Sequence, residues 1–317
     1  MPQVGTVSGA TGQECSAVHR SVADNDDTRR TPPLVPAKAR DATAQEAPSQ
    51  ALLIAMLRHQ AELHETDVAE LRERLDCAEL ELEDLRAIRD ALTPPELPRR
   101  PGLETAARFL PAAEHVGGDF YLVARGPRDA TVLVVGDVVG HGLVAAGRAA
   151  FVRTIFVATA PFSDDPVQLL RWVNAALIER AGTTHDFVTA ACATFLPHER
   201  RLRWAYAGHP PALRLDDGRE LAAGRQGAPL GLYHDPECVE GAHDAVPGEG
   251  VLLYTDGLTE ARHCDGRLLG VDAVGATLRE LGDQSPAQVV ETLSSQAQQF
   301  AAGDLDDDLC LLAARIS

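Results

Sequence analysis

The chain has 317 residues and a formal net charge of −18 at pH 7, so it can form one large domain with extra segments, or two domains. The acidic balance excludes a non-specific nucleic-acid binder, because such a protein needs a basic surface to contact phosphates. The six cysteines lie far apart without a C-x-x-C pair, which argues against a disulfide framework and favours a cytoplasmic location. No apolar run reaches the roughly 18 residues of a membrane-spanning helix, so we expect no membrane span.

Composition divides the chain into four segments. Residues 1–50 are rich in Ser, Thr, Ala, Pro and charged residues without an apolar period, which predicts a disordered tail. Residues 51–93 have a helical period and end at two prolines, which stop a helix. Residues 94–102 form a Pro-rich linker, and residues 103–317 read as one continuous globular domain.

Residues 51–92 carry a heptad pattern, in which mostly apolar residues recur at alternating spacings of four and three. This seam is polar only at His64 and Arg89. A parallel homodimer would place opposite charges together at its flanking positions, in the pairs Asp67 with Arg72, Arg74 with Glu79, and Glu81 with Arg86. We therefore predict a parallel coiled-coil dimer; the alternative is a single amphipathic helix packed on its own domain.

Beyond the linker, short strand-like runs alternate with turns and helical patterns. We expect strands at residues 104–109, 119–124, 131–136, 188–196, 202–207, 212–215, 251–254 and 309–316, and helices at 143–160, 166–180, 270–281 and 286–301. Asp165-Pro166 and Ser285-Pro286 are good helix starts, with a capping residue before a proline. Consecutive strands with paired helices indicate an α+β fold with mostly antiparallel pairing, and we expect two layered sheets with the helices outside.

Acidic residues border four of the predicted strands. Asp119 opens one strand, Asp137 and Asp256 each follow one, and the pair Asp307 and Asp308 opens the last. One such residue would be an ordinary turn aspartate. Four could converge, because paired strands bring their ends together, and converging like charges repel unless cations lie among them. Oxygen ligands favour Mg²⁺ or Mn²⁺ over zinc.

Six short motifs in fixed order then carry a family resemblance. They are VGGDFY (116–121), GDVVGHG (136–142), YAGHPPAL (206–213), APLGL (228–232), LYTDGLTEAR (253–262) and DDLCLL (307–312). Residues 103–316 resemble the bacterial SpoIIE/RsbU-like branch of the PP2C-type, metal-dependent serine/threonine phosphatases. The resemblance implies a two-layer antiparallel β-sandwich flanked by pairs of helices, preceded by the coiled-coil helix.

The resemblance also implies a centre of two Mn²⁺ or Mg²⁺ ions. Asp137 would bridge both ions with help from the backbone carbonyl of Val138, and Asp119 would contribute directly or through water. Asp256 and Asp307 would complete the shell of the second ion.

Two assignments within this centre stay open. Asp307 aligns with the first acid of the family's D-D-x-T pattern, but the additional Asp306 leaves Asp308 as an alternative ligand. His141 is either the general acid or a residue that only shapes its turn, because it follows Asp137 by four residues where relatives place a histidine after two. His209, in the AGHPPA turn, is expected to be structural.

The activity implied is hydrolysis of a phosphoserine or phosphothreonine monoester by a metal-activated water. In this branch the usual substrate is a phosphorylated STAS-domain anti-anti-sigma factor in a partner-switching pathway. The alternative from another class is an inactive pseudophosphatase that serves as a dimeric binding module. The intact Asp119, Asp137, Asp256 and Asp307 argue against it, since a degenerate member is expected to lack at least one of them.

Overall fold

A computed structural model describes the chain at residues 57–59, 68, 71–72, 74–75, 97–112, 117–140, 142–180, 187–303 and 305–317. The chain divides into two compact units, Met1–Glu65 and Thr66–Ser317. The predicted disordered tail lies outside the described residues. Eight positions of the predicted coiled coil are described, and all eight are helical. Within the described residues, no helix is both long and apolar enough to cross a membrane.

Two antiparallel sheets form the centre of the larger unit. One sheet has the strand order β1-β9-β8-β6 and the other has the order β2-β3-β4-β5-β7. The strands are β1 Leu103–Leu110, β2 Phe120–Arg125, β3 Thr131–Val138, β4 Val188–Leu196, β5 Arg201–Ala207, β6 Leu213–Arg214, β7 Gly241–Asp244, β8 Gly250–Tyr254 and β9 Leu309–Ile316. The sheets pack face to face, because alternate residues of β3 and β9, such as Leu133 and Leu312, share one hydrophobic core.

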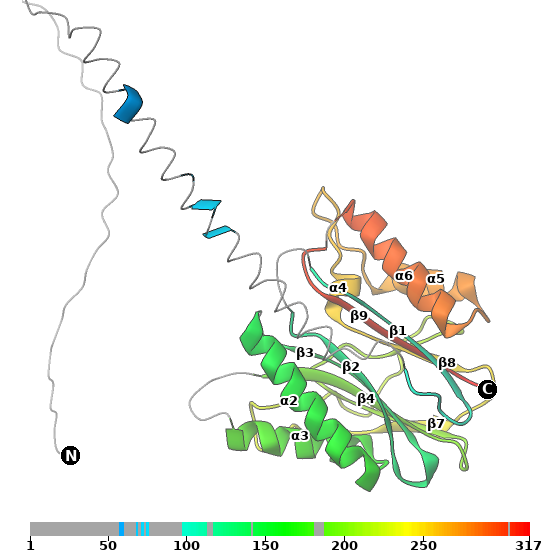
Figure 1. The fold of residues 1–317 in the computed structure, drawn as a ribbon. Coiled ribbons are helices and arrows are strands. Elements are labelled where there is room, and N and C mark those ends of the chain that lie inside the picture. Colours follow the sequence, from blue (N-terminus) through cyan, green and yellow to red (C-terminus); the bar gives the residue numbers. More distant parts are fainter. Residues whose placement is uncertain are drawn as a thin grey trace, which may run out of the picture. The chain divides into compact units, whose positions relative to one another are not determined.

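Helices cover the outer faces of both sheets, so both faces of each sheet are buried. Figure 1 shows α2 (Leu143–Thr159) and α3 (Pro166–Arg180) on one side and α5 (Val271–Leu281) and α6 (Pro286–Ala301) on the other. The remaining helical segments are the short α4 (Asp256–Thr259) and the 3-10 turns η1 (Pro127–Asp129) and η2 (Ala160–Phe162).

The sequence of the inner strands follows from this layering. In β3, Val132 and Val134 pack towards α2 and α3, whereas the alternating Leu133 and Val135 pack between the sheets. Successive side chains of a strand point to opposite faces, so a strand buried on both faces is apolar throughout. This is why residues 131–136 read as an unbroken apolar run.

The predicted fold class is confirmed, and most element bounds agree closely. The helix starts are also as expected: Asp165 accepts hydrogen bonds from the backbone N–H groups of Val167 and Gln168, and Ser285 forms a capping box with Gln288. The strand β7 and the helix α4 were not predicted. At four residues each, they are too short to show a period.

The strand connections bring the acidic residues to one end of the sandwich. Phe120 pairs with Gly136, so Asp119 and Asp137 flank one rung of the β2–β3 ladder. Tyr254 pairs with Leu311, so the residues after β8 and those before β9 meet at one end of the four-stranded sheet. Contacts of β3 with β8 and β9 connect the two sheets.

Candidate metal centre

The pKa values of three predicted ligands show that these carboxyl groups are electrostatic neighbours. Burial, followed by the charges of Asp256 and Asp307, raises the pKa of Asp137 to about 6. Burial and the charge of Asp137 raise the pKa of Asp119 well above its usual range. Burial and the charge of Asp307 raise the pKa of Asp256. An isolated cluster of this kind is unfavourable, whereas a cation beside it favours the ionised forms of all its members.

Asp307 and Asp308 have different surroundings, although they are adjacent in sequence. Asp308 is only 3% exposed, and its Oδ1 accepts the backbone N–H of Ala112 at 2.8 Å. A Cβ atom at Gly117 would lie 1.3 Å from Oδ2 of Asp308, so only glycine fits against this carboxylate. Asp307 is exposed, and its Oδ1 accepts the backbone N–H of Asp308 at 2.8 Å.

The chain passes close to the backbone of Val138 at the end of β3. The N–H of Val138 donates to the carbonyl oxygen of Gly118 at 3.3 Å. A Cβ atom at Gly118 would lie 2.3 Å from the Val138 carbonyl oxygen. Glycine therefore lets the segment that carries Asp119 pack directly on the segment that carries Asp137 and Val138.

A residue that the sequence did not single out contacts one of the predicted ligands. Thr255, directly before Asp256, donates a hydrogen bond from Oγ1 to Oδ2 of Asp119 at 2.6 Å. The sequence shows a threonine next to an aspartate but does not show that its hydroxyl meets a residue 136 positions away. In the sequence, the role of Thr255 is indicated only by its position in the LYTDG motif.

His209 is enclosed within the same end of the sandwich. It is 1% exposed, and both ring nitrogens have partners at 2.9 Å: Nδ1 meets Oγ1 of Thr189, and Nε2 meets the carbonyl oxygen of Tyr254. Burial lowers the pKa of His209 to about 4, so the ring is neutral at pH 7. The carbonyl can only accept, so Nε2 carries the proton and donates it, and Nδ1 accepts from the threonine hydroxyl. The ring thus connects β4 in one sheet to β8 in the other.

The donor set fits a hard divalent cation by its chemistry. Carboxylates and a backbone carbonyl are the ligands that Mg²⁺ and Mn²⁺ prefer. Among the described residues, no three His, Cys, Asp or Glu side chains already converge closely enough to hold a metal ion. Mg²⁺ usually keeps several waters and uses only one or two carboxylates, so a complete protein shell is not required. His141 lies outside the described residues.

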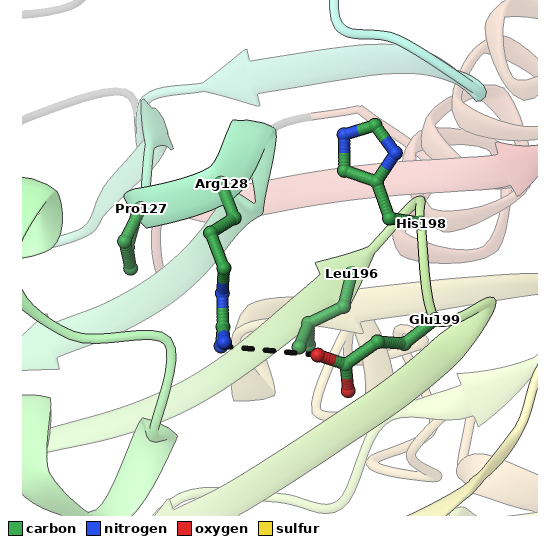
Figure 2. Close-up of a pocket in the computed structure, with 5 residues that line it drawn as sticks. All are labelled: Pro127, Arg128, Leu196, His198 and Glu199. Atoms are coloured by element: carbon green, nitrogen blue, oxygen red, sulfur yellow. Dashed lines mark ion pairs between the residues drawn. The ribbon is translucent and has the colours of Figure 1, made fainter.

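The hollow in Figure 2 does not belong to this group of carboxylates. Its volume is about 290 Å³, and it is lined by Pro127, Arg128, Leu196, His198 and Glu199. These residues come from the β2–β3 connection and from the end of β4. Because β3 and β4 are antiparallel, this is the opposite end of the five-stranded sheet from Asp137.

Comparisons with known proteins agree with this fold. The family model for stage II sporulation protein E (SpoIIE) matches residues 127–317. The phosphoserine phosphatase RsbU of Bacillus subtilis (strain 168) is 22% identical over 237 residues, which cover 74% of this chain and 70% of RsbU.

Solved structures show the same architecture. The crystal structure of the RsbU and RsbW domains of Rv1364c from Mycobacterium tuberculosis aligns with a TM-score of 0.56 and 27% identity, over 69% of this chain and 61% of that chain. RsbX, solved in complex with magnesium, aligns with a TM-score of 0.54 over 70% of this chain and 99% of that chain, and at 16% identity it shows a shared fold. Because the family model covers more than half of its residues, the chain belongs to the SpoIIE family, the SpoIIE/RsbU-like branch of the PP2C-type serine/threonine protein phosphatases.

Proposed function

We propose that this chain hydrolyses phosphoserine or phosphothreonine monoesters in a protein substrate, using divalent cations held at the carboxylate end of the sandwich. The observation that carries the proposal is the cluster of Asp119, Asp137, Asp256 and Asp307. Three of these groups, Asp119, Asp137 and Asp256, have pKa values raised first by burial and then by the charge of a neighbouring aspartate. A protein that gathers partly buried like charges at one place has an uncompensated electrostatic cost unless a cation binds there.

The ligand assignments come from the resemblance to the family, and the position of these residues at one end of the sandwich supports them. Asp137 would contact both ions, with the carbonyl of Val138 beside it, and Asp119 would contribute directly or through water. Asp256 and Asp307 would complete the shell of the second ion. Asp307 is preferred over Asp308, because its charge acts more strongly on Asp137 and Asp256, whereas Asp308 is buried against backbone groups.

Two ions bound here would lower the pKa of a water molecule towards about 7 and offset the charge of the phosphate. The chain's own part is to hold the carboxylates in place and to exclude other reactions. The exposed Asp307 lies where a phosphoprotein can approach from solvent. His141 is the candidate proton donor to the leaving serine or threonine oxygen, and this role rests on its position in the GDVVGHG motif alone.

We infer from the similarity to RsbU that the substrate is a phosphorylated STAS-domain anti-anti-sigma factor, in a cytoplasmic partner-switching pathway. The presence of an RsbU and an RsbW domain in Rv1364c, by its description, supports this inference. Purified chain should release phosphate from such a phosphoprotein faster than from an unrelated phosphoserine peptide. Equal rates on both would contradict the inference.

We further propose that the chain is a homodimer through residues 51–92. The four described seam residues Leu57, Val68, Leu71 and Leu75 expose 45–62% of their surface, and a second copy would cover them. Sedimentation equilibrium should give a dimer for the full chain and a monomer after a double substitution, Leu71→Glu with Leu75→Glu. A wild-type monomer at micromolar concentration would contradict this proposal.

The test of catalysis is hydrolysis of p-nitrophenyl phosphate by the full chain in EDTA, Mg²⁺ or Mn²⁺, beside Asp137→Ala. We expect activity that requires metal and is absent in the variant. Folded wild-type protein that neither binds metal nor hydrolyses this substrate or a phosphoprotein would favour the inactive binding module instead.

A further inference from the structure

We propose that Thr255 is a positioning residue for the metal centre, whose buried hydroxyl fixes Asp119 and ties it to the ends of β8 and β9. The inference rests on the proposed function, because it assigns Asp119 to that centre. Thr255 does not itself contact the cation or the substrate in this assignment.

The hydrogen bonds of Thr255 join three separate segments. Its hydroxyl donates to Oδ2 of Asp119 at 2.6 Å and accepts the backbone N–H of Cys310 at 3.0 Å. Its own backbone N–H donates to the carbonyl oxygen of Cys310, also at 3.0 Å. One residue thereby connects the start of β2, the end of β8 and the start of β9, which are the segments that carry Asp119, Asp256 and Asp307.

The direction of these hydrogen bonds is fixed by the atoms involved. A hydroxyl has one proton to donate, and the N–H of Cys310 can only donate. The hydroxyl must therefore accept from Cys310 and give its proton to Asp119. A donor aimed at a carboxylate forms a short, charge-assisted bond, and this commits one oxygen of Asp119 to Thr255.

Because Thr255 is buried, the loss of its hydroxyl cannot be compensated by solvent. Thr255 is 0% exposed, so no bulk water replaces its hydroxyl when it is removed. Groups that hold metal ligands in position typically change metal affinity or activity by about 10–100-fold when mutated. Valine has nearly the shape of threonine and lacks only the hydrogen-bonding group, so Thr255→Val isolates the hydroxyl.

The chain offers a matched control at the opposite end of the sandwich. Thr194 in β4 is also 0% exposed, and its hydroxyl donates to the carbonyl oxygen of Asp164 at 2.8 Å. Thr194→Val removes an equally buried hydroxyl bond, but one that involves no predicted metal ligand. Both variants are expected to lower the melting temperature in EDTA. Only Thr255→Val is expected to weaken the binding of the cation.

The experiment titrates Mn²⁺ into metal-free full-length protein and follows free Mn²⁺ by electron paramagnetic resonance. We expect Thr255→Val to weaken Mn²⁺ binding by about 10–100-fold, Thr255→Ser to restore it, and Thr194→Val to bind as wild type. Phosphatase activity of Thr255→Val should rise towards the wild-type value as Mn²⁺ is increased. Circular dichroism confirms that each variant is folded before titration.

The outcomes separate this inference from the proposed function. Wild-type affinity in folded Thr255→Val, or an equal loss in Thr194→Val, would overturn the role of Thr255. If wild-type protein binds no Mn²⁺, the proposed function itself fails. Should Thr255→Val not fold, Thr255→Cys is compared with Thr255→Ser, because the thiol is a much weaker hydrogen-bond donor than the hydroxyl. Equal Mn²⁺ affinity in that pair would overturn the inference.

Discussion

The two ends of the sandwich differ in how their charged side chains are arranged. At the Asp137 end, half-buried carboxyl groups gather. Burial and the charge of Asp137 raise the pKa of Asp119, and burial and the charges of Asp256 and Asp307 raise the pKa of Asp137. At the opposite end, Arg203 in β5 is surrounded by acids: it lies 3.1 Å from Oδ1 of Asp164 and 2.6 Å from Oε2 of Glu240. Arg128, beside the hollow in Figure 2, also pairs with Asp164.

The charges at the Arg203 end contribute to stability, whereas those at the Asp137 end serve the proposed function. Paired opposite charges at the Arg203 end satisfy one another and need no ligand. Like charges at the Asp137 end lower the stability of the metal-free protein, and they are expected where a cation must bind. Substitutions at the two ends should therefore have opposite consequences, which the following experiments test.

The largest effect is expected at Asp137. Asp137→Asn keeps the size of the side chain but removes the charge that both ions would share in the proposed centre, so turnover should fall by more than about 10³-fold. In EDTA the same variant should be more stable, because one of the mutually repelling charges is gone. A gain of about 1 kcal/mol would raise the melting temperature by roughly 2–4 °C. Calorimetry in EDTA measures it, and a clear loss of stability would contradict the account.

The lowered pKa of His209 makes the stability of the protein depend on pH. Its pKa is lowered to about 4 in the folded protein, from 6.5, so the unfolded chain binds more protons between these values. Its contribution is fully present above pH 6.5 and is lost as the pH falls towards 4. The shift corresponds to roughly 3 kcal/mol. In urea unfolding with EDTA, the stability difference between wild type and His209→Gln should shrink as the pH falls from 7 to 4.5. A difference that does not change with pH would refute the assignment.

The substitution Gly118→Ala tests the close approach of the segment that carries Asp119 to the segment that carries Val138. The Cβ atom of Gly118→Ala would lie 2.3 Å from the Val138 carbonyl oxygen, so the backbone must shift, at a cost of about 1–3 kcal/mol. Mn²⁺ affinity should fall as well. Gly147→Ala is the control, because Gly147 lies in α2 with no atom within 4 Å of the added Cβ. That control should gain about 0.5–1 kcal/mol and keep full activity. Urea unfolding and Mn²⁺ titration measure both variants.

The smallest effect is expected at Arg203. Arg203→Met keeps most of the aliphatic stem but leaves Asp164 and Glu240 without this partner. Because these acids are partly exposed, the loss of stability should be about 1–2 kcal/mol. Hydrolysis of p-nitrophenyl phosphate should remain at the wild-type rate. A loss of activity at temperatures where the variant is folded would show that the two ends are not independent.

The fold was largely predictable because both faces of the inner strands are buried, which leaves long apolar runs in the sequence. The bounds of β4, β9, α3 and α6 follow directly from these runs and from their capping residues. The edge strand β7 was missed because it pairs only with β5 and most of its residues are partly exposed. The predicted coiled coil remains a prediction, because its eight described positions show a helix but not its partner.

The site was predictable as a set of residue types but not as a set of contacts. The position of each aspartate at a strand end is visible in the sequence. The burial of Asp308 against Gly117 and the bond from Thr255 to Asp119 depend on segments far apart in the chain. Only the folded structure brings these segments together.

The most direct test of the account is a calorimetric titration of Mn²⁺ into metal-free wild type, Asp137→Asn and Arg203→Met. We expect about two ions per chain in wild type and in Arg203→Met, in keeping with a two-metal centre, and loss of this binding in Asp137→Asn. Wild-type binding in Asp137→Asn, or no binding in any of the three proteins, would contradict it.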